Sequence, residues 1–277
     1  PKQRIIDLIS KPAEKAKPWH EYREIFVTAS RIAAGIEFWK ENEAALNRAR
    51  LEFGVPGEII VAVIGVETNY GRNTGSFRVM DALSTLAFDY PPRARFFRSE
   101  LRELLLLARE ENKNPLELIG SYAGAMGYGQ FMPSSFRAYA KDFDGDGRRD
   151  IWSNRTDAIG SVANYFHRHG WDGEGQIALR VEVADDRVDQ FVNQGLKPKR
   201  SIAELRTAGM ESVSLPDETL AALFKLENRE GWEYWLGLHD FYVVTRYNHS
   251  HMYALAVVQL SKAIQSRWAE LKQSDRL

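Results

Sequence analysis

The pattern of apolar positions predicts helices through most of the chain. In the first fifty residues, apolar side chains recur at intervals of three or four, as at Ile32, Ile36 and Trp39. Residues 53–57 contain two glycines and a proline, which break this pattern. Later helices are predicted over residues 58–67, 93–112 and 154–169, and another begins at Pro133.

The pattern changes after Gly175. Ile177, Leu179, Val181 and Val183 alternate with polar residues, which predicts a strand. Strands are also predicted over residues 220–226 and 241–246, short helices over residues 187–193 and 202–205, and a long final helix over residues 250–271. The region between Gly175 and the final helix is therefore predicted to be a small mixed α/β insert.

These elements place the chain in the α+β class, mainly α with a small β-containing region. We expect four parts along the chain. They are an N-terminal helical region that packs with the C-terminal helix (residues 1–57), a core that includes an acidic loop (58–174), a small α/β domain (175–245) and a C-terminal helix that returns to the core (246–277).

Composition narrows the function classes without choosing one. The chain has 277 residues, 44% of them hydrophobic, which is enough for a sizeable core. Its formal net charge of -1 gives no support for a nucleic-acid partner or an anionic membrane. The absence of cysteine excludes disulfides and thiolate metal sites. No apolar run is long enough to cross a bilayer, and we expect a monomer.

The chain begins at Pro1 rather than at a methionine. We expect that it is a trimmed or mature fragment, and that any export signal or lipid anchor lies outside this sequence.

Glu67 is the most informative residue because it follows an apolar run. At helical spacing its neighbours are Val63, Ile64 and Tyr70. A carboxylate among apolar side chains costs free energy unless it is paired or used. Burial favours the neutral acid, which can donate a proton to a leaving group. Two interpretations remain from the residues alone: a catalytic acid, or a buried glutamate paired with an arginine or a backbone amide.

A glycine-rich segment, residues 120–130, is the second candidate for chemistry. Its glycines would let a ligand approach the backbone closely, and its tyrosines offer apolar faces with polar tips that suit a sugar. Gln130 can both donate to and accept from sugar hydroxyl or acetamido groups. The alternative is a tight packing seam between two helices, built from small residues.

An acidic loop matches the first half of an EF-hand. Asp142, Asp144 and Asp146 occupy positions one, three and five, and Gly147 occupies position six, where the chain turns sharply. Arg148 would contribute its backbone carbonyl at position seven. Clustered carboxylates repel one another unless a cation neutralises them, so the loop predicts a bound Ca²⁺.

The second half of the loop departs from the EF-hand pattern. Position twelve is Ser153 instead of a bidentate glutamate, and the next acid is Asp157. The chain has no second EF-hand loop, so we expect a structural site rather than a sensor, and no organic cofactor. A solvated acidic turn is the alternative.

Four segments together resemble the B family of bacterial lytic murein transglycosylases. In order, they are residues 65–71 around Glu67, residues 124–134, the loop that begins at Asp142, and residues 158–165. The resemblance implies a lysozyme-like catalytic core with a helical N-terminal part and a small α/β insert. It also implies that peptidoglycan glycan strands are the partner, in a periplasmic location, either soluble or with an outer-membrane lipid anchor.

The resemblance assigns roles to residues at matching positions. Glu67 matches the catalytic acid and base, and Ser121 and Gln130 match residues that contact the glycan. The positions that line the groove are matched by Tyr22, Tyr165, Tyr247, Asn248 and Tyr253. The calcium ligands are matched by Asp142, Asp144, Asp146, the carbonyl of Arg148 and Asp157.

The implied reaction cleaves the β-1,4 bond between N-acetylmuramic acid and N-acetylglucosamine and leaves a 1,6-anhydromuramoyl end. Glu67 would be the single acid that later acts as base, with the substrate acetamido group replacing a protein nucleophile. Two alternatives stay open: a muramidase that hydrolyses the same bond, and a non-catalytic module that binds peptidoglycan.

Overall fold

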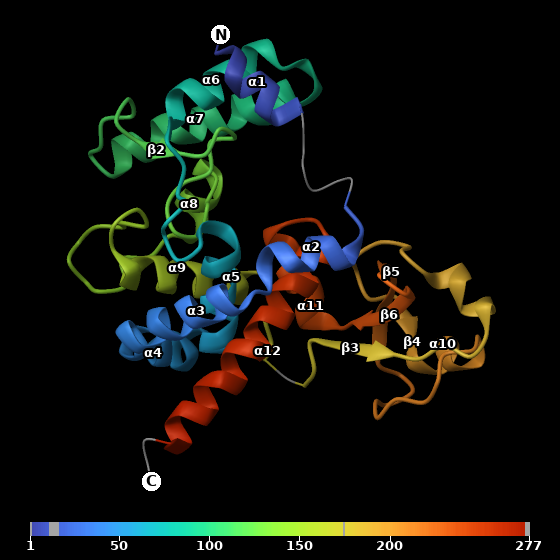
Figure 1. Ribbon diagram of the computed structural model, residues 1–277. Helices are drawn as coiled ribbons and strands as arrows, with labels where there is room; N and C mark the ends of the chain where they lie inside the picture. The colour runs from blue at the N-terminus through green and yellow to red at the C-terminus, as the bar shows by residue number, and fades with distance from the viewer. Residues whose placement is uncertain (1, 11–16, 174, 275–277) are drawn as a thin grey trace. The chain divides into compact units, whose positions relative to one another are not determined.

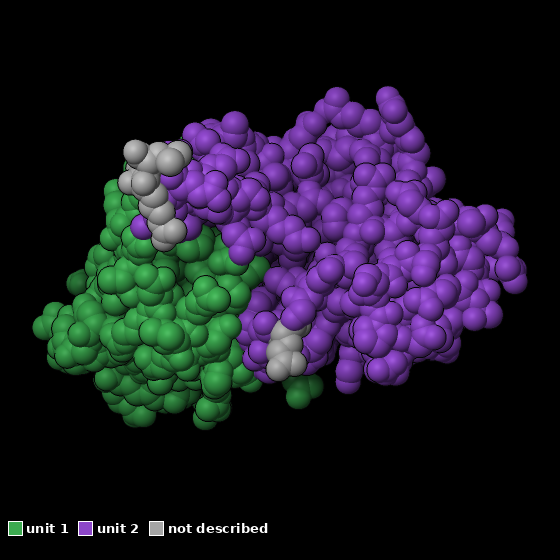
Figure 2. All heavy atoms as spheres, turned by 90° about the horizontal axis from the view of Figure 1, so that it is seen from below, with its two compact units in different colours: residues 1–15, 33–168 green, residues 16–32, 169–277 purple. Residues whose placement is uncertain are grey.

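The computed structural model describes residues 2–10, 17–173 and 175–274, and the chain divides into two compact units (Figures 1 and 2). The first unit comprises residues 1–15 and 33–168, and the second comprises residues 16–32 and 169–277. The fold is mainly α with small antiparallel sheets, which confirms the predicted class. Within the described residues, every helix is too short or too polar to cross a membrane.

Helices make up most of the first unit. Its elements are α1 (Gln3–Ser10), the greater part of α3 (Ala29–Glu41), α4 (Glu43–Phe53), α5 (Gly57–Thr68), β1 (Phe77–Arg78), α6 (Val79–Asp89), η2 (Pro91–Arg93), α7 (Ala94–Glu110), β2 (Ile119–Gly120), α8 (Pro133–Tyr139) and α9 (Arg155–Arg168). Helices α6 and α7 pack against each other with α1 beside them (Figure 1). Strands β1 and β2 form a short antiparallel pair.

Helix α5 is the buried centre of this unit. Its residues from Ile59 to Ile64 are at most 1% exposed. A helix that is apolar on all sides belongs in a protein core, and α5 packs between α4 and α9. The packed core around α5 therefore holds the end of this helix in place.

The second unit is built around a four-stranded antiparallel sheet. Its elements are α2 (Trp19–Phe26), β3 (Ala178–Val181), η3 (Asp186–Phe191), β4 (Arg200–Ser201), α10 (Ile202–Thr207), β5 (Leu220–Asn228), β6 (Gly231–Gly237), α11 (His239–Tyr247) and α12 (His251–Ser274). The strand order is β3-β6-β5-β4. Buried Val188, Ile202, Leu205, Leu223 and Leu236 form its core.

One prediction from the residue pattern is wrong, one holds only in part, and two elements were missed. Residues 241–246 were expected to be a strand but belong to helix α11. Their β-branched residues favour strands, but a helix places Phe241 and Val244 on one buried face. Residues 187–193 were expected to be helical, and the structure has a 3₁₀-helix there, η3. Strand β6 and helix α6 were not predicted.

Asp240 connects the start of α11 to the segment that precedes the sheet. Its carboxylate accepts hydrogen bonds from the backbone N–H groups of Asp172 at 3.2 Å and Gly173 at 3.0 Å. The side chain is buried, and burial raises the pKa of Asp240 from 3.8 to about 6. The folded chain therefore binds a proton at this position more readily than the unfolded chain does.

This difference makes stability depend on pH. Between the unfolded and folded pKa values the folded state binds more protons, so this group adds up to about 3 kcal/mol to the free energy of unfolding as the pH falls from about 7 to about 4. Asp240→Asn removes that contribution. The stability advantage of the wild type over the variant, measured by urea unfolding at several pH values, should grow as the pH falls.

Exposed Asp89 provides the matched control, as Asp89→Asn. A wild-type advantage over Asp240→Asn that stays constant across this pH range would contradict the prediction.

Candidate active site

Glu67 lies at the end of the buried helix. It is the next-to-last residue of α5 and is partly buried. The backbone N–H groups of Asn69 and Tyr70 close the helix by donating to the carbonyls of Gly65 at 3.0 Å and Ile64 at 3.3 Å. The chain then turns through three consecutive left-handed residues, of which Asn69 has φ 50°, Tyr70 φ 61° and Gly71 φ 86°.

A left-handed tyrosine is strained and persists only where its surroundings enforce it. Tyr70 is buried, and its ring folds back over the helix at Gly65, where an added Cβ would lie 2.6 Å from the tyrosine oxygen. An added Cβ on Gly71 would lie 2.2 Å from the ring of Tyr128. The glycines on either side of Glu67 therefore make room for two tyrosine rings, and Phe38 packs against both of these rings.

Thr68 joins the end of α5 to the glycine-rich segment. Its hydroxyl donates to the carbonyl oxygens of Tyr128 at 2.9 Å and Ile64 at 3.1 Å, which share its one hydrogen. The hydroxyl oxygen accepts a hydrogen bond from the N–H of Gly71 at 3.0 Å. This one side chain fixes both the helix end and the neighbouring loop, and so fixes the position of Glu67.

The glycine-rich segment is a series of tight turns, not a helix, so the helix-packing alternative is wrong. Met126 and Phe131 exchange two backbone hydrogen bonds of 2.9 Å, which close the intervening loop. Gln130 adopts a left-handed backbone with φ 49°. Its side-chain nitrogen donates to the carbonyls of Gly127 at 3.0 Å and Thr74 at 3.2 Å. Gln130 is thereby connected to the loop that follows Glu67.

Ser121 belongs to the same group of loops. Its hydroxyl oxygen accepts hydrogen bonds from the N–H groups of Ala123 at 3.3 Å and Ala125 at 3.1 Å. Those two bonds do not use the hydroxyl hydrogen, which can point toward a ligand. An added Cβ on Gly75 would lie 2.1 Å from the carbonyl oxygen of Gly120. The backbone beside Ser121 therefore touches the loop that follows Glu67.

Tyr165 comes from helix α9. It is 8% exposed, and its ring lies 5.9 Å from that of Phe131 and 4.9 Å from that of Tyr139. The first unit thus brings Glu67, Ser121, Gln130 and Tyr165 onto connected elements.

The other four predicted groove residues lie in the second unit. Tyr22 is in α2, Tyr247 ends α11, Asn248 follows it, and Tyr253 is in α12. Tyr22 and Tyr253 are buried, while Tyr247 and Asn248 are partly buried. The ring of Tyr22 stacks on Trp19. Their assignment to a glycan groove stays a prediction.

The acidic loop folds around its first aspartate. The carboxylate of Asp142 accepts hydrogen bonds from the N–H groups of Gly145 at 2.7 Å, Asp146 at 3.1 Å and Gly147 at 2.8 Å. Both glycines have positive φ, 83° and 87°, as the sharp turns require.

Oxygen atoms of Asp142, Asp144 and Asp157 come within 4.8 Å of one another. The carboxylate of Asp146 is not part of this group; it accepts the N–H of Arg148 at 2.8 Å. A set of closely spaced carboxylate oxygens fits a hard cation such as Ca²⁺.

Asp157 holds both ends of the loop. It is fully buried, and its two oxygens accept the N–H groups of Phe143 at 2.7 Å and Asp150 at 2.8 Å. Burial raises the pKa of this carboxyl. Asn154, just before α9, accepts the N–H of Thr156 at 3.0 Å and donates to Asp144 at 2.6 Å. That bond holds the pKa of Asp144 below its usual range.

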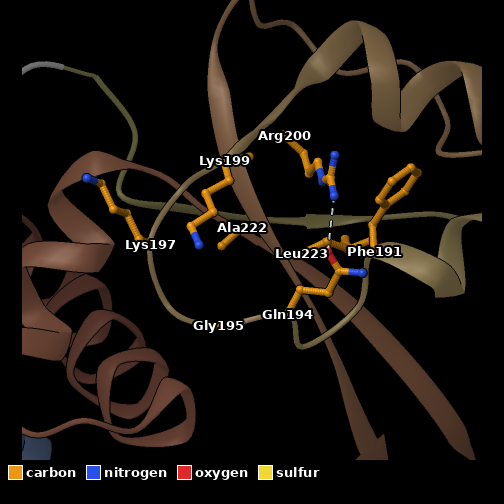
Figure 3. A pocket seen from close by; sticks show the side chains of 9 residues that line it. Phe191, Gln194, Gly195, Lys197, Lys199, Arg200, Ala222 and Leu223 are labelled. Atoms are coloured by element: carbon orange, nitrogen blue, oxygen red, sulfur yellow. Dashed lines mark hydrogen bonds between the residues drawn. The ribbon is translucent and has the colours of Figure 1, made fainter.

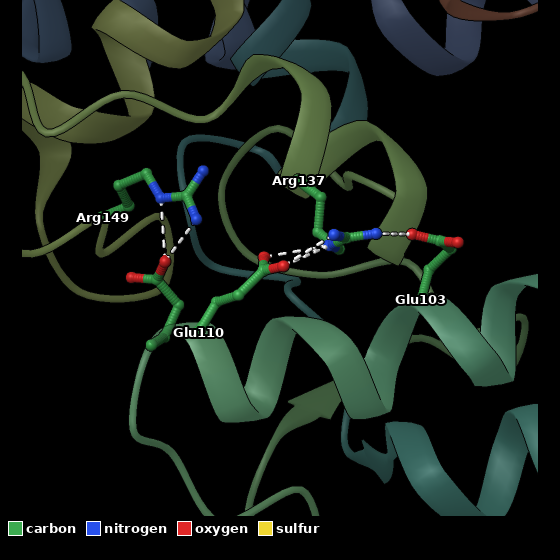
Figure 4. A network of polar contacts seen from close by, with 5 residues as sticks. Glu103, Glu110, Arg137 and Arg149 are labelled. Atoms are coloured by element: carbon green, nitrogen blue, oxygen red, sulfur yellow. Dashed lines mark hydrogen bonds and ion pairs between the residues drawn. The ribbon is translucent and has the colours of Figure 1, made fainter.

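A network of ion pairs fastens this region to α7 (Figure 4). Arg137 of α8 pairs with Glu103 and, through a fork of hydrogen bonds, with Glu110. Arg149, which follows the acidic turn, donates from its Nε to Glu111 at 2.9 Å. Forked arginine–carboxylate pairs fix orientation as well as distance.

Sequence reasoning missed Thr68, Tyr70 and Tyr128 as positioning residues. The spacing of Thr68 carries no signal, because its partner Tyr128 is 60 positions away along the chain. The left-handed backbone of Tyr70 also cannot be predicted from the sequence, because tyrosine rarely adopts that conformation.

Comparison with known proteins gives consistent results. The transglycosylase SLT domain family matches residues 1–262. Membrane-bound lytic murein transglycosylase B of Escherichia coli K12 is 48% identical over 257 residues, which cover 92% of this chain and 70% of that protein. The soluble lytic transglycosylase SltB1 of Pseudomonas aeruginosa has a crystal structure with a TM-score of 0.91 and 56% identity, covering 96% of this chain and 89% of that one. The Escherichia coli lytic transglycosylase Slt35 in complex with calcium has a TM-score of 0.87 and 45% identity, covering 96% of this chain and 84% of that one.

Thr68→Val tests the junction beside Glu67. Valine matches threonine in shape but leaves the Tyr128 carbonyl and the Gly71 N–H without this partner, which should lower the free energy of unfolding by about 1–3 kcal/mol. Thr68→Ser keeps the hydroxyl and should lose less than about 1 kcal/mol. Urea unfolding measures both. Equal losses in the two variants would show that the hydroxyl does not matter.

Proposed function

The chain belongs to the transglycosylase SLT domain family and is a peptidoglycan lytic transglycosylase, and from this premise we propose how its residues carry out the reaction. The observation that supports Glu67 as the catalytic acid is its position in the fold. It follows a fully buried stretch of α5, at a helix end that Thr68 fixes in place. The negative end of a helix dipole disfavours a carboxylate, which favours the neutral acid needed for proton donation.

In the first step, Glu67 donates its proton to the oxygen of the β-1,4 bond between N-acetylmuramic acid and N-acetylglucosamine. The bond from C1 to that oxygen breaks, and the leaving sugar departs as an alcohol. The carbonyl of the muramoyl 2-acetamido group stabilises the electron-poor C1 in place of a protein nucleophile.

In the second step, Glu67 is a carboxylate and removes the proton from the C6 hydroxyl of the same muramoyl sugar. The C6 oxygen attacks C1 and closes a 1,6-anhydro ring. A nucleophile carried by the same sugar has a very high effective concentration at C1, so it outcompetes water. The acid is regenerated, and no water is consumed.

The other buried acids of the first unit favour a mechanism with a single acid. Glu100 is 4% exposed and accepts hydrogen bonds from the N–H of Ser134 at 2.9 Å and its hydroxyl at 2.7 Å. The carboxylate of Asp157 already accepts two backbone hydrogen bonds in the acidic loop. Among the described residues of this unit, the two buried carboxylates therefore already accept hydrogen bonds from backbone N–H groups.

We assign glycan contacts to residues in both units. Ser121 offers a hydroxyl and Gln130 an amide on loops that connect to the helix end at Glu67. Tyr165 supplies an aromatic ring, which suits the apolar face of a sugar. The same role is proposed for Tyr22, Tyr247 and Tyr253, and an amide contact to the glycan is proposed for Asn248.

We also assign a structural Ca²⁺ to the acidic loop. Asp142, Asp144 and Asp157 would hold the ion with their carboxylates. Asp146, whose carboxylate lies outside this group, and the carbonyl of Arg148 stay proposed ligands on the family resemblance alone. Such an ion would neutralise the loop and hold it against α9, and it takes no part in the bond cleavage.

The site of action follows from the substrate. Peptidoglycan lies in the cell envelope, so the protein works there, and we propose a periplasmic or outer-membrane-attached form that acts as a monomer. The four-part division at residues 57, 174 and 245 stays a prediction.

Glu67→Gln should abolish turnover. General acid–base catalysis contributes about 10²–10⁴-fold per proton transfer, so solubilisation of purified sacculi should fall at least about a thousandfold while the melting temperature is kept. Glu58→Gln, in the first turn of the same helix, is the matched control and should retain activity. Mass spectrometry of the wild-type products should find muramoyl ends lighter by one water than hydrolysis would give. Reducing muramic acid ends would establish a muramidase instead, and equal clearing by Glu67→Gln would refute the catalytic role.

Calcium should raise thermal stability. A ligand that binds only the folded state at a hundredfold excess over its Kd adds about 2.7 kcal/mol, so the Tm should rise by several degrees from EDTA to excess Ca²⁺. Asp144→Asn should reduce this rise, whereas Asp89→Asn should not. A Tm that is the same in EDTA and in Ca²⁺ would show that the loop does not bind the ion.

A further inference from the structure

The second unit contains a pocket that the proposed chemistry does not use. It has a volume of about 360 Å³ and lies at the β4 edge of the four-stranded sheet (Figure 3). Its floor includes Ala222 and Leu223 of β5, which are buried residues, and Phe191 lines it as well. This volume falls in the range of small-molecule sites.

The path of the backbone creates the pocket. Strand β4 pairs with β5 at only two positions, Arg200 with Ala221 and Ser201 with Leu220. On the other side of Ala222, the N–H of Asn193 donates to the carbonyl of Leu223 at 2.9 Å. The N–H of Lys199 also donates to the carbonyl of Ala221, at 3.1 Å. Between these attachments residues 194–198 leave the sheet edge as an open ring, so the path of the backbone forms the hollow.

The rim of the pocket is basic. Lys197, Lys199 and Arg200 all line it. In Figure 3, Lys199 points into the ring and Arg200 lies beside Phe191, whereas Lys197 points outward from the loop. The guanidinium of Arg200 donates to Gln194 at 3.3 Å and stacks on the Phe191 ring.

The charge of this rim is only partly balanced by the protein. Some other cations of the second unit have close acidic partners, as Lys225 has in Asp189 and Arg206 has in Asp217 at 2.5 Å. Within the described part of the chain, Lys197 and Lys199 form no ion pair, and the nearest acid to Arg200 is Glu204 at 3.7 Å. Unpaired cations around a hollow concentrate anions there.

We propose that this pocket binds the carboxylates of the peptide stems of peptidoglycan, which rests on the proposed substrate. A stem peptide carries several carboxylates on a short chain that also has apolar side chains. The carboxylates match Lys199 and Arg200, and the apolar parts match the floor formed by Ala222 and Leu223. A bare phosphate would match only the basic rim.

Titration calorimetry of the full chain with a free stem pentapeptide tests the proposal. Lys199→Gln/Arg200→Gln should weaken binding about tenfold, because it removes two charge-assisted contacts. The control Arg180→Gln/Lys40→Gln removes the same charge from outside the pocket and should bind as wild type. Arg180 lies on β3, the opposite edge of the same sheet.

Glu204→Gln gives a test in the other direction. Glutamine preserves the capping box that Glu204 forms with Ser201. It lacks the negative charge that pairs with Arg200, so Arg200 becomes available to the peptide carboxylates. Peptide affinity should rise about two- to threefold, since a weak exposed pair is removed.

Three results would overturn the proposal: no binding of the peptide, equal binding by the double variant, or equal binding of a peptide whose carboxylates are converted to amides. Inorganic phosphate is a further arm, and phosphate that binds as tightly as the peptide would identify a phosphate site instead. The peptide has no glycosidic bond, so these results do not depend on Glu67 or on product chemistry. A failure of the catalytic assignment would appear only in the digestion of sacculi.

Discussion

The position at which helix α5 ends is the constraint on which the active site depends. The helix is apolar on all sides and is fixed by the core, so its last turn cannot shift. The hydroxyl of Thr68 then contacts the carbonyls of Ile64 and Tyr128 and the N–H of Gly71. One residue thereby fixes the helix end, the left-handed turn after it and the glycine-rich loop, and Glu67 is adjacent to it. The strain at Tyr70 and Gln130 is sustained by this packing.

The buried carboxylates of this protein serve two different purposes. Glu100, Asp157 and Asp240 each accept hydrogen bonds from two donors, and in every case at least one donor is a backbone N–H. Each thus replaces hydration with fixed donors and joins two segments of chain. Glu67 is instead partly buried at a helix end, where the dipole disfavours negative charge. Glu100, Asp157 and Asp240 are thus suited to holding loops, whereas the position of Glu67 supports the proton transfer that we propose for it.

The two units present different chemistry to a polymer. The first unit holds an acid, amides and hydroxyls on tightly turned loops, which suit a neutral glycan. The second unit holds a basic hollow over an apolar floor at a sheet edge. Peptidoglycan combines a neutral glycan with charged peptides, and the basic hollow of the second unit suits the peptides.

The sequence by itself determined the elements that depend on near neighbours. The apolar run before Glu67 predicted α5, alternation predicted β3, and the spacing of Asp142, Asp144 and Asp146 predicted a sharply turned acidic loop. Its ordered motifs also identified the family. Tertiary structure alone decided that residues 241–246 form a helix, that the Asp146 carboxylate lies outside the group of Asp142, Asp144 and Asp157, and that Thr68 bonds to Tyr128. The physical reason is range: side-chain periodicity is set within a few residues, whereas these contacts arise only when distant segments fold back and compete for the same hydrogen-bond partners and the same core.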